Sequence, residues 1–170
     1  MDAVGAERMR QRSIALDNSG AAGNDRLQGG VMKTFADLEV GMRLPPLKMT
    51  VTEEWIATDL ALAADPNPPE KNPDHFGSVI APPALTNADF DRVLRANGFD
   101  MSGVIPTKTR HEYFGPLHLG QTIVTTCEVI DKYERKGRIY VTFEFVTSDL
   151  TGRVLVKKRD TLLQMPVEAA

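Results

Sequence analysis

The sequence predicts an α+β domain, with helices in the first half of the folded region and antiparallel strands in the second. From Leu117 to Met165 there is no proline, and β-branched and aromatic residues dominate. Upstream of Leu117, two stretches carry apolar residues at helical spacing, and six of the 11 prolines lie between them. Separate runs of helices and strands are typical of folds in which the helices cover one face of an antiparallel sheet.

One domain accounts for most of the 170 residues, and we expect it to span residues 32–170. Residues 1–31 hold five of the 13 glycines and too little apolar surface to offset the entropy lost on ordering. They are therefore predicted to form a flexible N-terminal leader, and Met32 is a candidate natural start of the protein.

The composition excludes several classes of protein. With 20 basic and 23 acidic residues, the net charge of -3 provides no positive field to attract a nucleic acid. The longest apolar run, Leu60 to Ala64, is too short to span a membrane, and the first residues lack the apolar stretch of a secretory signal. Cys127 is the only cysteine, which rules out an intramolecular disulfide. We therefore expect a soluble, cytoplasmic protein that binds neither nucleic acid nor membranes.

The first elements are predicted from local signals. The segment Phe35–Gly41 ends in a turn, and a short extended stretch follows at Leu47–Val51. Apolar residues recur at helical spacing in Thr52–Ala64, with Thr50 or Thr52 as the N-cap. These signals predict a short strand followed by a helix.

A second helix is predicted at Ala84–Ala96. It follows a proline-rich segment, from Pro66 to Pro83, that excludes a regular helix or a central strand. Asn97-Gly98 supplies the signal that ends the helix.

Four antiparallel strands are predicted in the remainder of the domain. Val141, Phe143 and Phe145 alternate with more polar residues, which is the period of a sheet with one buried face. Lys136-Gly137 and Thr151-Gly152 supply the hairpin turns. The predicted strands are Lys108–Phe114, Thr122–Lys132, Arg138–Ser148 and Arg153–Met165.

Simple motifs for metal or cofactor chemistry are absent from the sequence. There is no Gly-x-Gly-x-x-Gly, no phosphate-binding loop ending in Gly-Lys-Ser/Thr, no Gly-x-Ser-x-Gly and no His-Glu-x-x-His. None of the three histidines is paired with another at metal-ligand spacing. We expect neither a metal nor an organic cofactor.

The segment Asp65-Pro-Asn-Pro68, directly after the first predicted helix, is the main candidate for chemistry. A carboxylate held in a rigid loop can act as an acid or a base, or can orient a water molecule. The same residues are also ordinary turn formers, in which Asp65 and Asn67 would bond only to backbone amides. Residue types alone leave both interpretations open and favour the turn.

Five segments, in order over most of Thr34–Met165, carry a resemblance to a known family. They are Phe35-Ala-Asp-Leu-Glu-Val-Gly41, Thr50-Val-Thr-Glu-Glu-Trp-Ile56, Asp65-Pro-Asn-Pro68, Phe76-Gly-Ser-Val-Ile-Ala-Pro-Pro83 and His111-Glu-Tyr-Phe-Gly-Pro-Leu-His-Leu-Gly120. Together they resemble the MaoC-like acyl-CoA dehydratases and hydratases. The match is closest to the N-terminal type of domain in that family, in which Ile-Ala-Pro-Pro replaces the Ile-Ala-His-Gly of the catalytic type.

This resemblance implies a hot-dog fold, in which an antiparallel sheet wraps around a central helix, here Pro83–Asn97. It also implies an acyl-CoA or other acyl thioester as the ligand, with the acyl chain beside the central helix. A homodimer, or a heterodimer with another hot-dog subunit, is the implied assembly.

The resemblance also supplies candidate catalytic residues. Catalytic members carry Asp-x-Asn-Pro-x-His, whose Asp and His hold a water molecule and move a proton. This chain keeps Asp65 and Asn67 but has Glu70 at the position of the histidine. Glu70 could serve as the base, and His75 could swing in. Equally, the change could mark a domain that binds a thioester without turning it over.

Backbone amides at the start of the central helix are expected to polarise the thioester carbonyl, as the family resemblance implies. Because Pro82 and Pro83 lack an N–H, the donors are expected from Ala81, Ala84 or Leu85. His111 is a further substrate-binding candidate, and the alternative is a strand-edge residue bonded to the backbone.

Other conspicuous residues are expected to be structural. Tyr113 and Trp55 are predicted to pack rather than to contact a ligand. Cys127 is predicted to be a small core residue. Lys157-Lys158-Arg159 is predicted to be a solvated strand end, with contact to carrier phosphates or to an acidic partner surface as the alternative.

The sequence thus predicts an enoyl thioester hydratase or 3-hydroxyacyl thioester dehydratase. The alternative is a non-catalytic acyl-CoA-binding subunit that pairs with a catalytic homologue. Thioester hydrolysis is a third, less favoured possibility.

Overall fold

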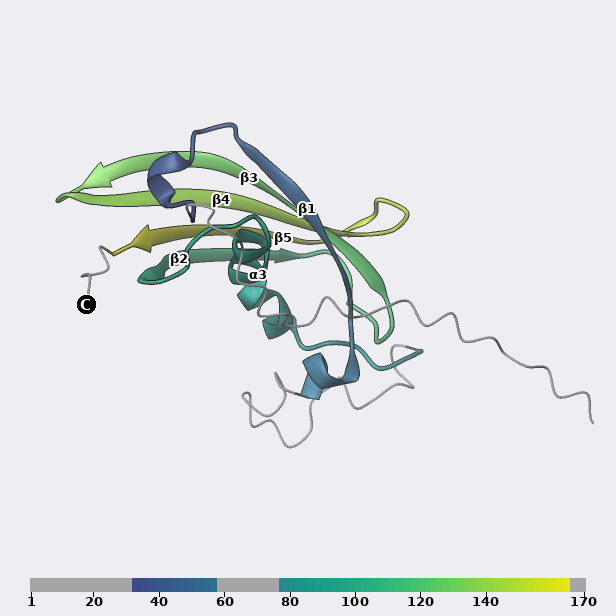
Figure 1. Ribbon diagram of the computed structural model, residues 1–170. Helices are drawn as coiled ribbons and strands as arrows, with labels where there is room; N and C mark the ends of the chain where they lie inside the picture. Colours follow the sequence, from purple (N-terminus) through teal and green to yellow (C-terminus); the bar gives the residue numbers. More distant parts are fainter. Residues whose placement is uncertain (1–31, 58–76, 166–170) are drawn as a thin grey trace, which may run out of the picture. The chain divides into compact units, whose positions relative to one another are not determined.

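A single antiparallel sheet dominates the computed structural model, which describes residues 32–57 and 77–165 (Figure 1). Its five strands lie in the order β1-β3-β4-β5-β2, so that β1 and β2 form the edges. The α+β class is therefore confirmed. The division into a leader and one domain stays a prediction, because residues 1–31 lie outside the described residues. The strands are Arg43–Thr50 (β1), Val104–Tyr113 (β2), Thr122–Arg135 (β3), Arg138–Asp149 (β4) and Val154–Gln164 (β5).

The four strands predicted from alternation and turn signals are confirmed. On β4, Val141, Phe143 and Phe145 are at most 1% exposed, as the period-two pattern requires. The β3–β4 hairpin turns at Lys136 and Gly137, whose φ angles are 53° and 69°. Two consecutive positive φ angles are those of the tight hairpin turn that matches the twist of the strands.

The first strand is longer than predicted, since β1 begins at Arg43 and runs through Pro45 and Pro46. Prolines are tolerated there because β1 is an edge strand and its register shifts between Leu44 and Leu47. Before β1, the short helix η1 (Phe35–Asp37) leads into the predicted turn at Gly41, whose φ is 88°.

The central helix differs from the single helix predicted over Pro83–Asn97. It begins as a 3-10 helix, η3 (Pro83–Ala88), and continues as the α-helix α3 (Asp89–Ala96), which is capped by Asn97, where the sequence predicts the stop. Of the earlier helix, residues 53–57 are described, and Thr52 Oγ1 caps it by accepting a hydrogen bond from the Trp55 N–H at 3.2 Å. In the described ranges, no helix has both the length and the apolar character needed to cross a membrane.

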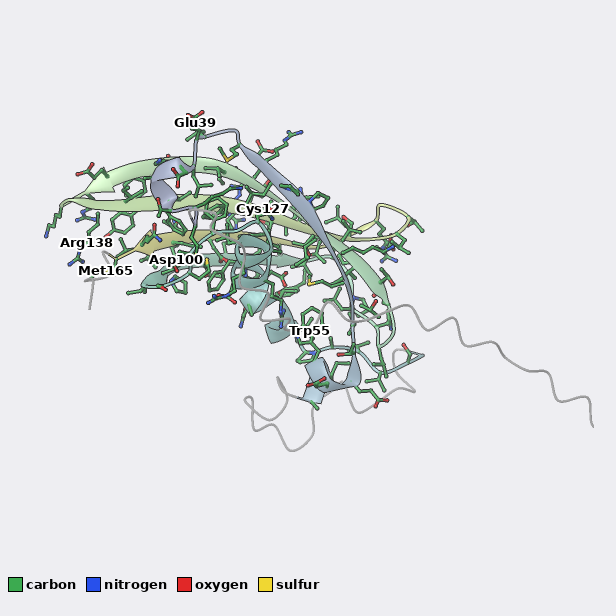
Figure 2. The ribbon with its side chains drawn as sticks, viewed as in Figure 1. Glu39, Trp55, Asp100, Cys127, Arg138 and Met165 are labelled. Atoms are coloured by element: carbon green, nitrogen blue, oxygen red, sulfur yellow. The ribbon has the colours of Figure 1, made fainter. Side chains whose placement is uncertain are left out.

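The main core lies between α3, η1 and the sheet. The Phe35 ring meets the Phe143 ring edge to face, with 5.8 Å between centroids. Cys127, labelled in Figure 2, is 2% exposed within this core, and burial raises the pKa of its thiol to about 12. This thiol stays protonated at neutral pH, so the prediction of a small core residue is confirmed. A second cluster surrounds the start of η3 and includes Val51, Ile56, Ala81, Leu85, Leu117, Ile123, Leu155 and Val156.

Candidate active site

An apolar pocket of about 370 Å³ opens beside the start of η3. Most of its wall is aliphatic or proline, and the hydroxyl groups of Thr86 and Tyr113 are the side-chain polar groups in its lining. A concave apolar cavity with few polar groups is the usual form of a small-molecule site. The lining residues are Ile80, Ala81, Pro82, Pro83, Thr86, Tyr113, Gly115, Pro116, Leu117 and Val156.

Two backbone segments are held together where they form this wall. The Ala81 N–H donates to the Leu117 carbonyl at 2.7 Å, and the Leu119 N–H donates to the Val79 carbonyl at 2.9 Å. A side-chain hydrogen bond of 2.7 Å joins Ser78 Oγ and His118 Nδ1. These bonds fix the segment that leads into η3 before the helix begins.

The three predicted amide donors, Ala81, Ala84 and Leu85, differ in where they lie and in what their N–H groups bond to. Ala81 lines the pocket, but its N–H is already bonded to Leu117. Leu85 is 1% exposed in the core, and its N–H donates to the Pro82 carbonyl at 3.0 Å. Ala84 lies within η3, between them in sequence. The N–H groups of Ala81 and Leu85 are therefore engaged in the fold, and the role of Ala84 as a donor stays a prediction.

Tyr113 links β2 to the start of η3 at the mouth of the pocket. Its hydroxyl donates to the Pro83 carbonyl at 3.1 Å and lies 2.6 Å from His111 Nδ1. A hydroxyl that donates to Pro83 must accept from the imidazole, which selects the tautomer with hydrogen on Nδ1. The prediction that Tyr113 only packs is wrong, because its side chain is 48% exposed and lines the pocket.

His111 is half-buried and does not line the pocket, but acts on it through Tyr113. Burial and the positive charge of Lys158 lower the pKa of His111 below its ordinary value. Burial also raises the pKa of Tyr113. Both groups are therefore neutral near pH 7, and the pair is a hydrogen-bonding unit that carries no charge.

Lys158 departs most from the sequence prediction of a solvated strand end. It is 2% exposed and lies 2.9 Å from Asp160 Oδ2, and Asp160 is 1% exposed. The neighbours Lys157 and Arg159 are exposed, as predicted. Alternation along β5 puts Val156, Lys158 and Asp160 on the inner face, and this period of two is the signal that could have revealed the buried lysine.

Asp89, on the first turn of α3, joins this buried charged cluster. Its pKa is raised to about 6, mainly by burial, with a smaller contribution from the negative charge of Asp160. Lys158 and Arg92 oppose the shift, and Arg92 Nη1 lies 3.6 Å from Asp89 Oδ1. The cluster therefore combines two acidic side chains, Asp89 and Asp160, with two basic ones, Lys158 and Arg92.

The predicted catalytic residues Asp65, Asn67 and Glu70, together with His75, lie outside the described residues. Their roles stay predictions. Within the part of the chain that the structure describes, no group of three or more His, Cys, Asp or Glu residues could hold a metal ion.

Solved structures share this fold. The R-hydratase PhaJ1 from Pseudomonas aeruginosa is 21% identical, with a TM-score of 0.62 over 79% of this chain and 90% of that chain. A MaoC-like dehydratase from Rhodospirillum rubrum is 23% identical, with a TM-score of 0.63 over 81% of this chain and 100% of that chain. The HadBC (3R-hydroxyacyl-ACP dehydratase) complex from Mycobacterium tuberculosis is 18% identical in sequence, with a TM-score of 0.61 over 73% of this chain and 96% of that chain.

The sequence itself matches a family model. Comparison with curated proteins gives no match. The model described as FAS1-like, dehydratase domain region, matches residues 40–157, which is more than half of the chain. The sheet wrapped around a central helix agrees with that match. The chain belongs to the FAS1-like dehydratase domain family, with the hot-dog fold of the MaoC-like dehydratases.

Proposed function

We propose that the chain binds an acyl thioester, such as an acyl-CoA, with the acyl chain in the pocket beside η3. The observation that carries this proposal is the pocket itself, which is almost wholly apolar and lies at the start of the central helix. An acyl chain gains free energy from leaving water for such a surface. The dehydratase family assignment supports the thioester as the group at the pocket mouth.

The proposed reaction is the reversible addition of water to an enoyl thioester. A base removes a proton from water while the water oxygen bonds to the β-carbon. The electron pair of the double bond moves toward the thioester carbonyl, and a proton is then delivered to the α-carbon. Asp65 is the proposed residue that orients and activates the water, Glu70 replaces the family histidine, and Asn67 shapes the loop. The Ala84 N–H is the proposed donor to the enolate oxygen, where charge develops.

Turnover is tested with the purified full chain and enoyl-CoAs of increasing length, starting from crotonyl-CoA. Loss of the enoyl absorbance is expected, and Asp65→Asn should reduce the rate at least 100-fold, on the order of the loss expected for a general base. Glu39→Gln, a change in an exposed carboxylate, is the matched control and should retain full activity. Absence of turnover at every chain length would contradict catalysis by this chain alone.

A second hot-dog chain is the proposed partner. The proposed contact is the outer edge of β2, which pairs with no other strand of the described sheet. Most β2 side chains are exposed, and Ile105 and Phe114 are 46% and 52% exposed on and beside it. An unpaired strand edge with exposed apolar residues favours association. Ile105→Arg/Phe114→Arg should shift the mass in light scattering to that of a monomer. Leu150→Arg, an exposed apolar residue in a turn, should not.

The second candidate function is a non-catalytic acyl-binding subunit. Glu70 at the position of the family histidine favours it. This function predicts that the chain alone binds a saturated acyl-CoA but does not consume an enoyl-CoA. Activity that appears only on mixing with a catalytic homologue would select it over the hydratase, and robust activity of the chain alone would exclude it.

A further inference from the structure

Lys158 directs its ammonium group to the main chain of η3. Nζ donates hydrogen bonds to the carbonyl oxygens of Thr86 at 2.8 Å and Asn87 at 2.9 Å. The rings of Phe90 and Phe145 flank Nζ, with centroids 5.3 and 5.4 Å away. The ammonium is thus enclosed between the sheet and the central helix.

Asp160 supplies the counter-charge without sharing in this anchoring. Its Oδ2 lies 2.9 Å from Nζ, but Oδ1 has no hydrogen-bond partner among the described residues. Burying two charges costs several kcal/mol per ion, and a pair with incomplete hydrogen bonding recovers that cost poorly. The stability of the fold is therefore a weak reason for this lysine, and its hydrogen bonds to η3 are the feature to explain.

Side chains hold η3 at both ends. At its start, the Pro83 carbonyl accepts from the Tyr113 hydroxyl at 3.1 Å and from Thr86 Oγ1 at 3.2 Å. Toward its end, Lys158 holds the carbonyls of Thr86 and Asn87. A 3-10 turn is frequent at the start of an α-helix, and the side chains of Tyr113 and Lys158 bond to the carbonyls of this one. Because Pro83 and Thr86 line the pocket, any shift of η3 would move the pocket wall.

We infer that Lys158 is a positioning residue that fixes η3 as the wall of the thioester pocket. The inference rests on the proposed function for its ligand. Lys158 acts through the carbonyls of Thr86 and Asn87 and does not touch the thioester. A purely structural lysine would support the whole sheet, whereas a positioning lysine acts on one segment.

The test compares Lys158→Met with Lys157→Met in the full chain. Lys157 is the adjacent residue on β5 but is exposed, so its variant is the matched control. In Lys158→Met, amide hydrogen exchange should be at least tenfold faster in residues 84–90 and unchanged in β3 and β4. Binding of decanoyl-CoA, measured by calorimetry, should weaken at least fivefold. Lys157→Met should leave the exchange of η3 unchanged.

Each other outcome is decisive. Unchanged exchange in η3, or faster exchange across the whole sheet, would overturn the inference. If the wild-type chain does not bind decanoyl-CoA, the proposed function fails, and the exchange data alone decide whether Lys158 fixes η3. If Lys158→Met does not fold, Lys158→Met/Asp160→Asn, which removes both charges of the pair, is measured in its place. Failure of both variants to fold would assign Lys158 to folding and overturn the inference.

Discussion

The hydroxyl of Tyr113 donates a hydrogen bond to the carbonyl oxygen of Pro83, 3.1 Å away, and thereby joins an edge strand to the first residue of the central helix. This bond links residues 30 positions apart in the chain, at the mouth of the apolar pocket. The same hydroxyl lies 2.6 Å from His111 Nδ1. One side chain therefore couples the position of η3 to β2.

Tyr113→Phe should destabilise the fold modestly and weaken ligand binding. The variant keeps the ring and loses the hydrogen bond, so the free energy of unfolding in urea should fall by about 1 kcal/mol. Binding of decanoyl-CoA should weaken because the pocket wall at Pro83 is held by fewer bonds. Tyr133→Phe is the control, since the Tyr133 ring stacks on Tyr140 at 5.0 Å and is also exposed. Equal effects of the two variants would contradict the role of Tyr113.

Asp89 should give the fold a distinct dependence on pH. Its folded-state pKa of about 6 exceeds the ordinary 3.8, so the folded chain binds the proton more tightly than the unfolded chain. The stabilising contribution is complete below pH 4 and is lost as the pH rises through 6. The loss amounts to about 3 kcal/mol. The free energy of unfolding of the wild type, relative to Asp89→Asn, should fall across this range and then level off. Parallel profiles of the two proteins would rule out this titration.

Gly137→Ala should weaken the β3–β4 hairpin. Gly137 has a φ of 69°, where an L-residue with a β-carbon costs about 1 to 2 kcal/mol. The free energy of unfolding should fall by about that amount, measured by chemical denaturation. Lys136→Asn, at a φ of 53°, should be neutral or slightly stabilising, because Asn tolerates this region of backbone space. A neutral Gly137→Ala would contradict the turn geometry.

Thr147→Val should lower the free energy of unfolding, because it leaves the buried hydroxyl of Thr125 without its partner. Thr125 Oγ1 and Thr147 Oγ1 are 2.9 Å apart, and both residues are buried. Removing one hydroxyl at nearly constant volume should cost about 1 to 3 kcal/mol, read from thermal or urea unfolding. Thr125→Val/Thr147→Val should cost less than the two single changes together, because neither hydroxyl of the pair is then left without the other. The hydrogen bond from Thr147 to Asp89 is lost equally in Thr147→Val and in the double variant. Thr126→Val, on the exposed face of β3, serves as the control.

The strands were predictable because their signals are local. Alternation in β4 and the Lys136-Gly137 turn each depend on a few neighbouring residues, and the structure matches both. The start of the central helix was not predictable in detail. Its carbonyls accept hydrogen bonds from Tyr113 and Lys158, which are distant in the sequence.

The candidate site shows the same division. Ala81 was identified through the resemblance and does line the pocket. The N–H groups of Ala81 and Leu85 donate hydrogen bonds to the carbonyls of Leu117 and Pro82. Residue types alone do not reveal these bonds, because they depend on how the backbone segments are arranged in the fold. Lys158 was misassigned because a run of three basic residues is usually solvated, and tertiary packing overrides that pattern here.

The most direct test of the proposed site is a crystal structure of the full chain with a bound saturated acyl-CoA. The acyl chain is predicted to lie in the pocket against Pro83, Tyr113 and Val156, with the thioester carbonyl oxygen within hydrogen-bonding distance of the Ala84 N–H. A thioester bound elsewhere on the chain, or a pocket that stays empty while the ligand is bound, would contradict the account.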